Sequence, residues 1–410
     1  MFNIKISFFL VASFMVCSAT KLFGQTNPTS PTVVLGSNGT SPIVTSVPFL
    51  NITPDSRSGA MGDAGVAISA DANSIYWNAA KLAFAKPRYG VALSYNPWLR
   101  NLVGDMSLSY LSGYYRLDDK QAIGLEMRYF DMGSIQFTDP NGAIVMNFRP
   151  SEFAFGAAYS RKLSENMGVS VTGRFVYSNL SGNFSSGNQQ DAKPGTTGAA
   201  DIAWYYKNDK WIKINGQPAQ LSFGANISNI GAKISYINAG TADFIPTNMR
   251  IGTALEMNLD PEGKNKLTGA LDFNKLLVPT PQRMENGQVV GVDPRTRTVL
   301  SGMFGSFADA PGGFSEELKE FMVSIGAEYS YNNLFFARAG YFGENATKGN
   351  RKYFTVGAGF KYNNLGIDVS YLAAAGANSP LGNTLRFTIS LAIEKTMKEK
   401  ITKPEETEVK

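Results

Sequence analysis

From residue 89 onward, the sequence repeatedly alternates large apolar residues with small or polar ones. Near the end, for example, Leu385, Phe387 and Ile389 alternate with Arg386 and Thr388. Successive side chains of a β-strand point to opposite faces, so a period of two predicts a strand with one apolar face. We count fourteen such segments, which begin near residues 88, 104, 121, 152, 166, 198, 218, 247, 265, 320, 333, 351, 364 and 383.

The length of these segments indicates where the strands lie. Most run for about 10 to 13 residues, whereas strands of soluble proteins usually have about 5 to 6. A tilted strand that crosses a bilayer needs about 9 to 11 residues. An open sheet is excluded in lipid, because the N–H and C=O groups at its edges would have no partners. We therefore expect an all-β fold, a 14-stranded antiparallel transmembrane β-barrel over residues 88–394.

The charged residues of the strands provide an independent test. Eleven of them share the face of the small and polar residues: Glu126, Arg128, Arg174, Arg250, Glu256, Asp272, Glu328, Arg338, Lys361, Asp368 and Arg386. A charge that faced lipid at mid-bilayer would cost about 2–4 kcal/mol, so this arrangement predicts lipid outside and a charged lumen. A soluble sandwich, the less favoured alternative, would have shorter strands and a buried apolar face. We interpret these carboxylates as ion-pair partners of the arginines and of Lys361, rather than as catalytic acids and bases.

The connections between strands are alternately short and long. Residues 117–120, 164–166, 331–333 and 362–364 form tight turns, whereas most connections of the other set, such as 132–151 and 276–319, are long. Outer-membrane barrels have short periplasmic turns and long extracellular loops. The long loops are therefore expected outside the cell, with both chain ends in the periplasm.

The two ends of the sequence predict export and flexible extensions. Lys5 and the apolar run 6–16 have the pattern of a signal peptide, which we place at residues 1–24. Residues 25–48 are expected to be a flexible periplasmic linker, and residues 395–410 a charged periplasmic tail. The only cysteine, Cys17, lies in the signal peptide, so the exported chain would have no thiol.

Composition excludes several classes of function. The chain contains no histidine, which rules out Ser-His-Asp hydrolases, histidine metal sites and histidine-ligated haem. Its net charge of +5 is spread out rather than gathered in a basic block, so no nucleic-acid partner is expected. We expect no cofactor, no metal site and no enzymatic activity.

Residues 49–87 differ from the strands because they are rich in Gly and Ala and have no period of two. The segment is too apolar for a linker and too irregular for a lipid-facing strand, so we expect an N-terminal hatch, or plug, inside the barrel. Asp63 is expected to hold the plug in place by hydrogen bonds, the alternative being contact with a partner. Trp77 and Asn78 are expected to pack the plug against the wall, the alternative being a direct role in ligand binding.

Two parts of this segment carry a resemblance to a known family. Residues 59–67 (GAMGDAGVA) and 77–82 (WNAAKL) resemble the N-terminal hatch of the FadL-like outer-membrane barrels, which have fourteen strands. Ala79 and Lys81 depart from that pattern, in which Pro and Gly occupy these positions. Within the FadL-like barrels, residues 52–63 resemble the PorV (LptO) family of the type IX secretion system of Bacteroidetes.

The resemblance implies a non-enzymatic role in protein secretion at the cell outer membrane. Proteins of that family take cargo with a conserved C-terminal domain from a SprA-type translocon. They carry it to an attachment complex that contains a PorU-type sortase. The other partner would be outer-membrane lipid. An alternative is a FadL-like transporter of fatty acids or other hydrophobic compounds. A lipid-modifying enzyme is disfavoured, because known barrel enzymes of that kind use a histidine.

The long connection 276–319 is the first candidate for partner binding. Loops longer than about 12–15 residues are usually functional or disordered, and this one has about 44. Its candidate contact residues are Pro279, Pro311, Phe314 and Leu318, with simple shielding of the barrel mouth as the alternative. Ser315 is expected to be the N-cap of a short helix. Loops 132–151 and 181–197 are second candidates.

Overall fold

The computed structural model describes residues 41–100, 103–138, 141–180, 193–214, 216–237, 242–286, 288–375 and 381–393. The expected signal peptide, the charged tail, most of the expected linker and much of loop 181–197 lie outside the described residues. No helix in the described part of the chain is long and apolar enough to cross a membrane.

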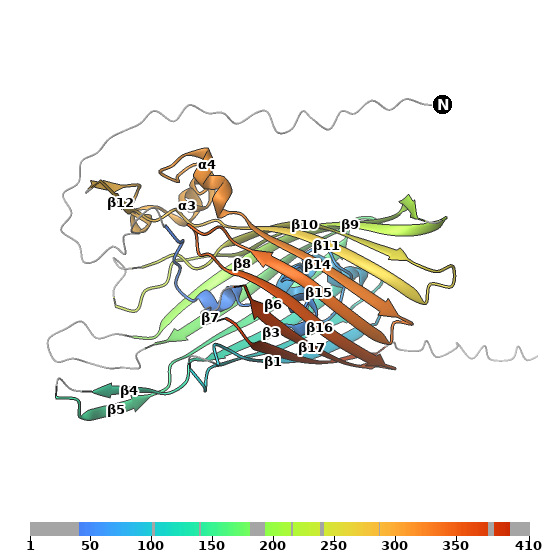
Figure 1. The fold of residues 1–410 in the computed structure, drawn as a ribbon, viewed down its shortest axis with the longest axis horizontal. Helices are drawn as coiled ribbons and strands as arrows, with labels where there is room; N and C mark the ends of the chain where they lie inside the picture. The colour runs from blue at the N-terminus through green and yellow to red at the C-terminus, as the bar shows by residue number, and fades with distance from the viewer. Residues whose placement is uncertain are drawn as a thin grey trace, which may run out of the picture. The chain divides into compact units, whose positions relative to one another are not determined.

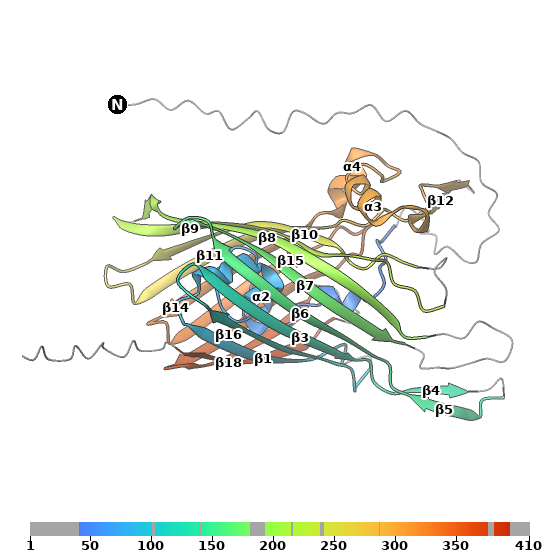
Figure 2. The same ribbon diagram turned by 180° about the vertical axis from the view of Figure 1, so that it is seen from behind.

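Fourteen strands close into an antiparallel barrel, in which each strand pairs with its neighbours in sequence and β1 pairs with β18 (Figures 1 and 2). Their first residues agree with the starts of the fourteen predicted segments to within a few residues, although β8, with 20 residues, is longer than predicted. The barrel strands are β1 (Tyr89–Pro97), β2 (Ser107–Arg116), β3 (Gln121–Asp131), β6 (Ser151–Lys162), β7 (Met167–Asn179), β8 (Gly195–Ile214), β9 (Gln217–Gly231), β10 (Asn248–Asn258), β11 (Asn265–Leu276), β14 (Met322–Tyr331), β15 (Phe335–Gly343), β16 (Lys352–Tyr362), β17 (Leu365–Ala374) and β18 (Thr384–Ile393).

The two faces of the wall differ as the alternation predicted. Leu93 and Ile389, which are cross-strand partners, are each 54% exposed on the outer face. Glu126, on the inner face, is 2% exposed. A soluble sandwich would bury its apolar face, whereas this wall presents that face outward and is fit to contact lipid. The predicted barrel is therefore confirmed.

Short turns and long connections lie at opposite ends of the barrel. The turn between β14 and β15 contains Asn332 and Asn333 with φ angles of 55° and 53°, which suits a tight hairpin turn. We call this end the short-turn end and the other the long-loop end. At the long-loop end, the β3–β6 connection forms a hairpin of β4 (Ile135–Thr138) and β5 (Ile144–Phe148), at the left of Figure 1.

The connection between β11 and β14 contains its own secondary structure. It forms the hairpin β12 (Arg283–Glu285) and β13 (Gln288–Val290), then η4 (Pro294–Thr296), α3 (Val299–Gly305), α4 (Phe314–Glu317) and η5 (Leu318–Glu320). We call residues 277–321 the cap. Helix α4 begins two residues earlier than predicted, and Gly313 rather than Ser315 is its N-cap. The prediction for Ser315 was wrong because the preceding Gly313, at φ 68°, already turns the chain into the helix.

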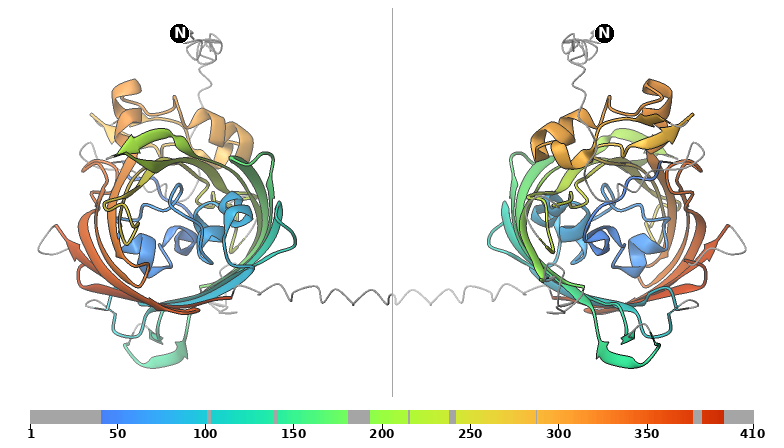
Figure 3. Two further views of the ribbon diagram at one scale, coloured as in Figure 1. Left: turned by 90° about the vertical axis from the view of Figure 1, so that its right-hand side faces the viewer. Right: turned by 90° about the vertical axis from the view of Figure 1, so that its left-hand side faces the viewer.

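The N-terminal segment runs through the barrel. It contains η1 (Pro48–Asn51), α1 (Ser56–Gly59), α2 (Ser74–Trp77) and η2 (Ala79–Phe84), which lie within the ring of strands in Figure 3. We call residues 48–87 the plug segment. Most of its apolar side chains, such as Phe49, Met61 and Leu82, are fully buried.

This segment enters the barrel at the long-loop end. The backbone N–H of Ser41 donates to the carbonyl of Thr347, and its hydroxyl to the carbonyl of Pro281. At the other end of the segment, Arg88 accepts from Arg116 beside a short turn. Residues 41–48 therefore lie at the long-loop end, together with the loops predicted to be extracellular. Residues 25–48 were predicted to lie in the periplasm, at the end of the barrel with the short turns. Residues 41–48 lie at the other end, because the segment crosses the lumen before β1 begins.

Candidate functional site

The first contact between plug and wall is formed by glycines. Gly326 of β14 and Gly340 of β15 are cross-strand partners, and a Cβ on either would overlap the backbone of Met61 or Gly62. The backbone N–H of Gly62 donates to Thr355 Oγ1 of β16 at 2.8 Å, and that hydroxyl donates to the carbonyl of Ala60 at 2.9 Å. The wall thus allows the plug backbone to approach it directly at this point.

A second contact of the same kind lies on another part of the wall. Gly224 of β9 and Gly252 of β10 are cross-strand partners, and a Cβ on either would overlap Val66. Asp272 of β11 accepts from the backbone N–H groups of Gly65 and Val66 at 2.7 and 2.9 Å. Asp272 was predicted to pair with an arginine, but in the structure its carboxylate binds plug backbone.

Asp63 lies between these two contacts. Its φ of 62° is in the left-handed region, where Asp is among the few residues tolerated. The hydroxyl of Tyr353 donates to its carboxylate, and Arg386 Nη1 lies 3.6 Å from Asp63 Oδ1. The contacts of Asp63 are thus with two wall residues, which is the arrangement that a role in holding the plug requires.

Trp77 and Asn78 connect distant parts of the plug and the wall. Trp77 Nε1 donates to Asp55 Oδ1 at 2.7 Å, and the carboxylate of Asp55 also caps α1. Asn78 Nδ2 donates to the carbonyls of Val66 and of Trp204 in β8, at 3.1 and 2.9 Å. Asn78 also caps η2 by accepting from the N–H of Ala80. Both side chains are fully buried, so their contacts fit the expected packing role.

Several predicted lumen charges form one cluster on β3, β7 and β8. Glu126 accepts from Arg128 at 3.0 Å and from Arg174 at 2.7 Å. Arg174 also pairs with Asp201 at 2.8 Å, and Arg128 donates to the plug carbonyl of Leu50 at 2.7 Å. Asp201 was not among the predicted residues. The alternation of its strand could have identified it, because Asp201 does not share the face of the large apolar residues.

A second cluster joins the plug to β14, β15 and β17. Arg57 of α1 donates to both carboxylate oxygens of Glu328, at 3.0 and 2.9 Å, and pairs with Asp71 at 3.1 Å. Arg338 pairs with Glu328 and with Asp368, each at 2.6 Å. Arg57 was missed by sequence reasoning because the plug has no periodicity that would show which way it points.

The remaining predicted lumen charges have different surroundings. Arg250 donates to the hydroxyl of Tyr76 at 3.0 Å. The guanidinium groups of Arg128 and Arg250 lie 4.5 and 4.8 Å from the centre of the Tyr76 ring, a distance at which cations and aromatic rings attract. Glu256 and Lys361 line a cavity of about 430 Å³ at the short-turn end, and neither has an ion-pair partner among the described residues.

Buried ion pairs also order the cap. Lys275, which is fully buried at the end of β11, pairs with Glu317 at 3.2 Å and with Glu320. Lys348, from the connection between β15 and β16, pairs with Glu316 at 2.7 Å and with Glu320 at 2.9 Å. The three cap carboxylates are therefore held by cations from two other parts of the barrel rim.

The pKa values of two cap carboxyls differ in direction. Burial alone would raise the pKa of Glu316, but hydrogen bonds from Lys348 and Arg283 outweigh it and lower the pKa to about 2. Burial raises the pKa of Asp309 to about 6, despite hydrogen bonds from Thr280, and the nearby Glu317 adds to the rise.

The cap exposes several large apolar side chains. On α3 and just after it, Leu300, Phe304 and Phe307 are exposed, and Phe304 is 72% accessible. Leu300 and Phe304 are four residues apart in α3, which places them on one side of the helix. Phe314 and Leu318 are exposed on α4 and η5, with Phe314 at 76%. We call these five residues the cap patch.

The predicted contact residues of this loop differ in accessibility. Phe314 and Leu318 belong to the cap patch, whereas Pro279 is buried and Pro311 is half-buried. Pro279 lies beneath α3, where a Cβ on Gly302 would contact its ring at 3.1 Å. Sequence reasoning could not make this distinction, because it depends on how the loop folds back on itself.

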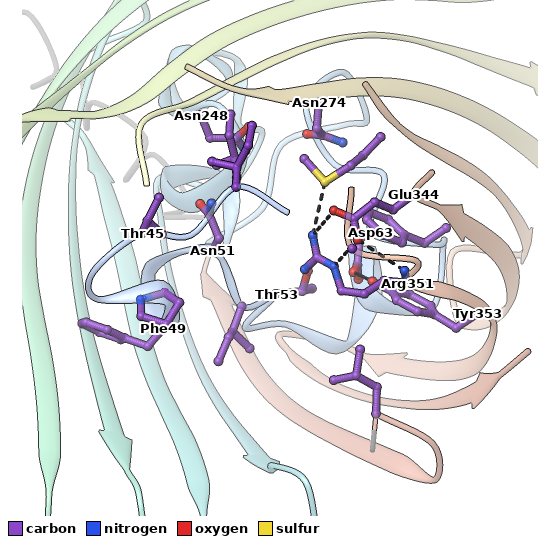
Figure 4. A pocket seen from close by; sticks show the side chains of 18 of the residues that line it. Thr45, Phe49, Asn51, Thr53, Asp63, Asn248, Asn274, Glu344, Arg351 and Tyr353 are labelled. Atoms are coloured by element: carbon purple, nitrogen blue, oxygen red, sulfur yellow. Dashed lines mark hydrogen bonds and ion pairs between the residues drawn. The ribbon is translucent and has the colours of Figure 1, made fainter. Parts of the chain in front are cut away.

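A cavity of about 480 Å³ lies between the plug and the long-loop end of the lumen (Figure 4). We call it the long-loop cavity. It is lined by residues 42–53, by the plug residue Asp63 and by inward side chains of β10, β11, β16 and β18, which include Asn248, Asn274 and Arg386. In the described part of the chain, no group of acidic or cysteine side chains is arranged to hold a metal ion.

Comparison with known proteins assigns the sequence to a family. The sequence matches the family described as "Type IX secretion system protein PorV" over residues 37–283. No curated protein sequence matches the chain significantly.

The solved structures that match the chain include two toluene transporters and a FadL homologue. The toluene transporter TodX of Pseudomonas putida is 11% identical, with a TM-score of 0.48, over 83% of this chain and 99% of TodX. The toluene transporter TbuX of Ralstonia pickettii is 12% identical, with a TM-score of 0.46, over 83% of this chain and 98% of TbuX. A FadL homologue of Pseudomonas aeruginosa is 12% identical, with a TM-score of 0.40, over 87% of this chain and 99% of that protein.

The family match covers more than half of the chain, and the closed 14-stranded barrel has an apolar outer face. The protein therefore belongs to the PorV family and is an outer-membrane component of the type IX secretion system.

Proposed function

We propose that this protein binds exported cargo with a conserved C-terminal domain at a SprA-type translocon. It then carries the cargo to the surface attachment complex that contains a PorU-type sortase. Membership of the PorV family supports this role. The observation that carries the proposal is the cap patch, an apolar surface on an ordered loop at the rim of the barrel.

The cap patch has the character of a protein-binding surface. Shielding of the barrel mouth would not require exposed aromatic side chains, whereas exposed apolar patches with polar surroundings mark interaction sites. The patch rests on the buried pairs of Lys275 and Lys348 with cap carboxylates, which hold it in a fixed position. A pre-ordered surface loses less conformational entropy on binding than a flexible loop does.

The plug supports binding rather than conduction. Two glycine contacts, the Arg57–Glu328 pair and the Asp272 hydrogen bonds hold it against separate parts of the wall. In our proposal the plug stays in place and the lumen is closed to proteins. Transport of fatty acids or other hydrophobic compounds remains the alternative, but many of the side chains that line the lumen are charged and offer a hydrocarbon little apolar surface.

Substitution of the cap patch tests the proposal. In the native bacterium we would compare Phe304→Ser/Phe314→Ser with a matched control, Leu117→Ser/Leu259→Ser. The control replaces exposed apolar residues at the short-turn end. Truncation of a central aromatic contact commonly costs at least about 2 kcal/mol. The cap variant should therefore retain at least about 10-fold less translocon and cargo in pull-downs, and cargo should remain in the periplasm. Equal recovery from both variants would contradict the proposal.

We also propose that the long-loop end faces the outside of the cell. Because the exported chain is expected to contain no cysteine, single cysteines can report on this directly. Ser301→Cys in the cap should react with a membrane-impermeant maleimide on intact cells, whereas Asp119→Cys in a short turn should react only after lysis. The reverse pattern would invert the proposed orientation.

A further inference from the structure

We propose that the long-loop cavity binds an extended peptide segment of a partner protein. That the peptide comes from a secretion partner rests on the proposed function. That the cavity suits a peptide is argued from its lining alone. The cavity is lined by the N-terminal segment, the β15–β16 connection and wall residues, so it reaches the same end of the barrel as the cap.

Three asparagines give the cavity unused hydrogen-bonding groups. Asn51 comes from η1, Asn248 from β10 and Asn274 from β11, and all three line the cavity (Figure 4). The Oδ1 atom of each is buried without a hydrogen-bond partner among the described residues. The residues Asn248 and Asn274 are only 3% and 6% exposed. A buried polar group without a partner costs about 1–3 kcal/mol, so a ligand that supplies partners is favoured.

A charged pair adds a further donor and acceptor at the same cavity. Arg386 is 2% exposed, and its Nε–H has no acceptor in the described part of the chain. Asp63 Oδ1 likewise has no hydrogen-bond donor within the described ranges, since Arg386 Nη1 is 3.6 Å away. The cavity therefore presents both unused donors and unused acceptors.

Apolar side chains form the rest of the lining. Met322, Phe342 and Leu372 belong to one hydrophobic cluster and Phe49 to another, and all four line the cavity. Leu372 and Phe49 are almost fully buried. The volume of about 480 Å³ is within the usual range for ligand pockets of about 300–1,000 Å³. The cavity thus offers both polar groups and apolar side chains around a space large enough for a few amino-acid residues.

This mixture of groups selects among classes of ligand. A hydrocarbon chain would cover the apolar patches but would leave the asparagine, arginine and aspartate groups unpaired. A sugar would satisfy the polar groups but would gain little from four apolar side chains. An extended peptide has a backbone donor and acceptor at each residue, together with side chains that fill apolar pockets. The peptide is the ligand class that uses both parts of the lining.

Affinity selection on the purified, detergent-solubilised protein tests this inference. The probe is a mixed library of pentapeptides with acetylated N-termini and amidated C-termini, and retained peptides are measured by mass spectrometry. We expect Asn248→Leu/Asn274→Leu to retain at least 10-fold less peptide than the unmodified protein. The matched control Gln220→Leu, at the short-turn cavity, should retain as much peptide as the unmodified protein.

A second variant and two other probes make the result decisive. Leu372→Trp should fill the cavity and also abolish retention, so that the inference does not depend on the folding of one variant. Decanoate and maltotriose are tested separately on the same variants. Equal peptide retention by all variants would overturn the inference, and so would asparagine-dependent retention of decanoate or maltotriose instead of peptide.

The assay separates this inference from the proposed function. It contains no translocon and no full-length cargo, so a negative result would refute only peptide binding in the cavity. Failure of the cap-patch variants to affect secretion would instead refute the proposed docking surface and would leave the peptide result unchanged.

Discussion

The plug and the cap are both irregular segments that buried charges hold in place, but they differ in where they put their apolar side chains. The plug buries Phe49, Met61 and Leu82 completely, whereas the cap exposes Phe304 and Phe314. Isolated buried ion pairs do not generally add stability over apolar packing. Their effect is to favour one conformation of the segment that carries them. In this protein, buried ion pairs fix the plug, whose apolar side chains face inward, and the cap, whose apolar side chains face outward.

The two segments also differ in how many independent contacts hold them. The plug has two glycine contacts, the Asp272 hydrogen bonds and the Arg57 cluster, which together involve β9, β10, β11, β14, β15 and β17. The ion pairs between the cap and the rest of the barrel form one network around Glu316, Glu317 and Glu320. A segment held at many points loses one contact at modest cost, whereas a segment held by one network is sensitive to each of its members. The predictions below test this difference.

The largest effect is expected from Lys275→Met in the cap. Loss of the ammonium leaves Glu317 without an ion-pair partner among the described residues and Glu320 with only Lys348. Removal of one partner of a buried pair costs about 3–5 kcal/mol. We expect faster hydrogen–deuterium exchange across residues 294–320, while the barrel strands keep their protection. Unchanged hydrogen–deuterium exchange in the cap would show that this ion-pair network does not hold the cap in place.

Arg57→Met should have a smaller effect on the plug. Glu328 would still pair with Arg338 at 2.6 Å, so the expected cost is at or below the lower limit of about 3 kcal/mol for such pairs. We expect a lower temperature of thermal unfolding in detergent and no release of the plug to added protease. An Arg57→Lys variant is the control and should recover part of the loss. Complete plug release from this single change would show that the contacts are not independent.

Gly340→Val tests the glycine contact itself. A Cβ at this position would overlap the backbone of Gly62, and overpacking of this kind costs about 1–3 kcal/mol. The matched control is Gly269→Val on β11, where a Cβ would meet nothing within 4 Å. We expect increased protease sensitivity near residues 60–66 in the first variant only. Equal sensitivity in the two variants would mean that close approach to the wall does not position the plug.

The wall was predictable from the sequence, whereas the plug contacts and the cavity were not. The parity of Glu328 and Arg338, together with the two-asparagine turn between their strands, is enough to place them as cross-strand neighbours. Asp201 could have been found in the same way. Arg57, Asn248 and Asn274 could not be assigned their roles, because these depend on how an aperiodic segment packs against strands far away in the sequence.

The smallest expected effect is the pH dependence of the cap. The pKa of Asp309 is raised to about 6, so its ionised form disfavours the folded cap and its protonation stabilises the cap as the pH falls below about 6. The pKa of Glu316 is lowered to about 2. The stabilisation that it contributes is therefore complete above the ordinary glutamate pKa of about 4.5 and is lost as the pH falls from there towards 2. Protection of the cap from hydrogen exchange, corrected for the intrinsic rate at each pH, should rise slightly from pH 7 to 5 and decrease below about pH 4.5. Asp309→Asn should remove the rise but not the decrease, and persistence of the rise in that variant would show that another group causes it.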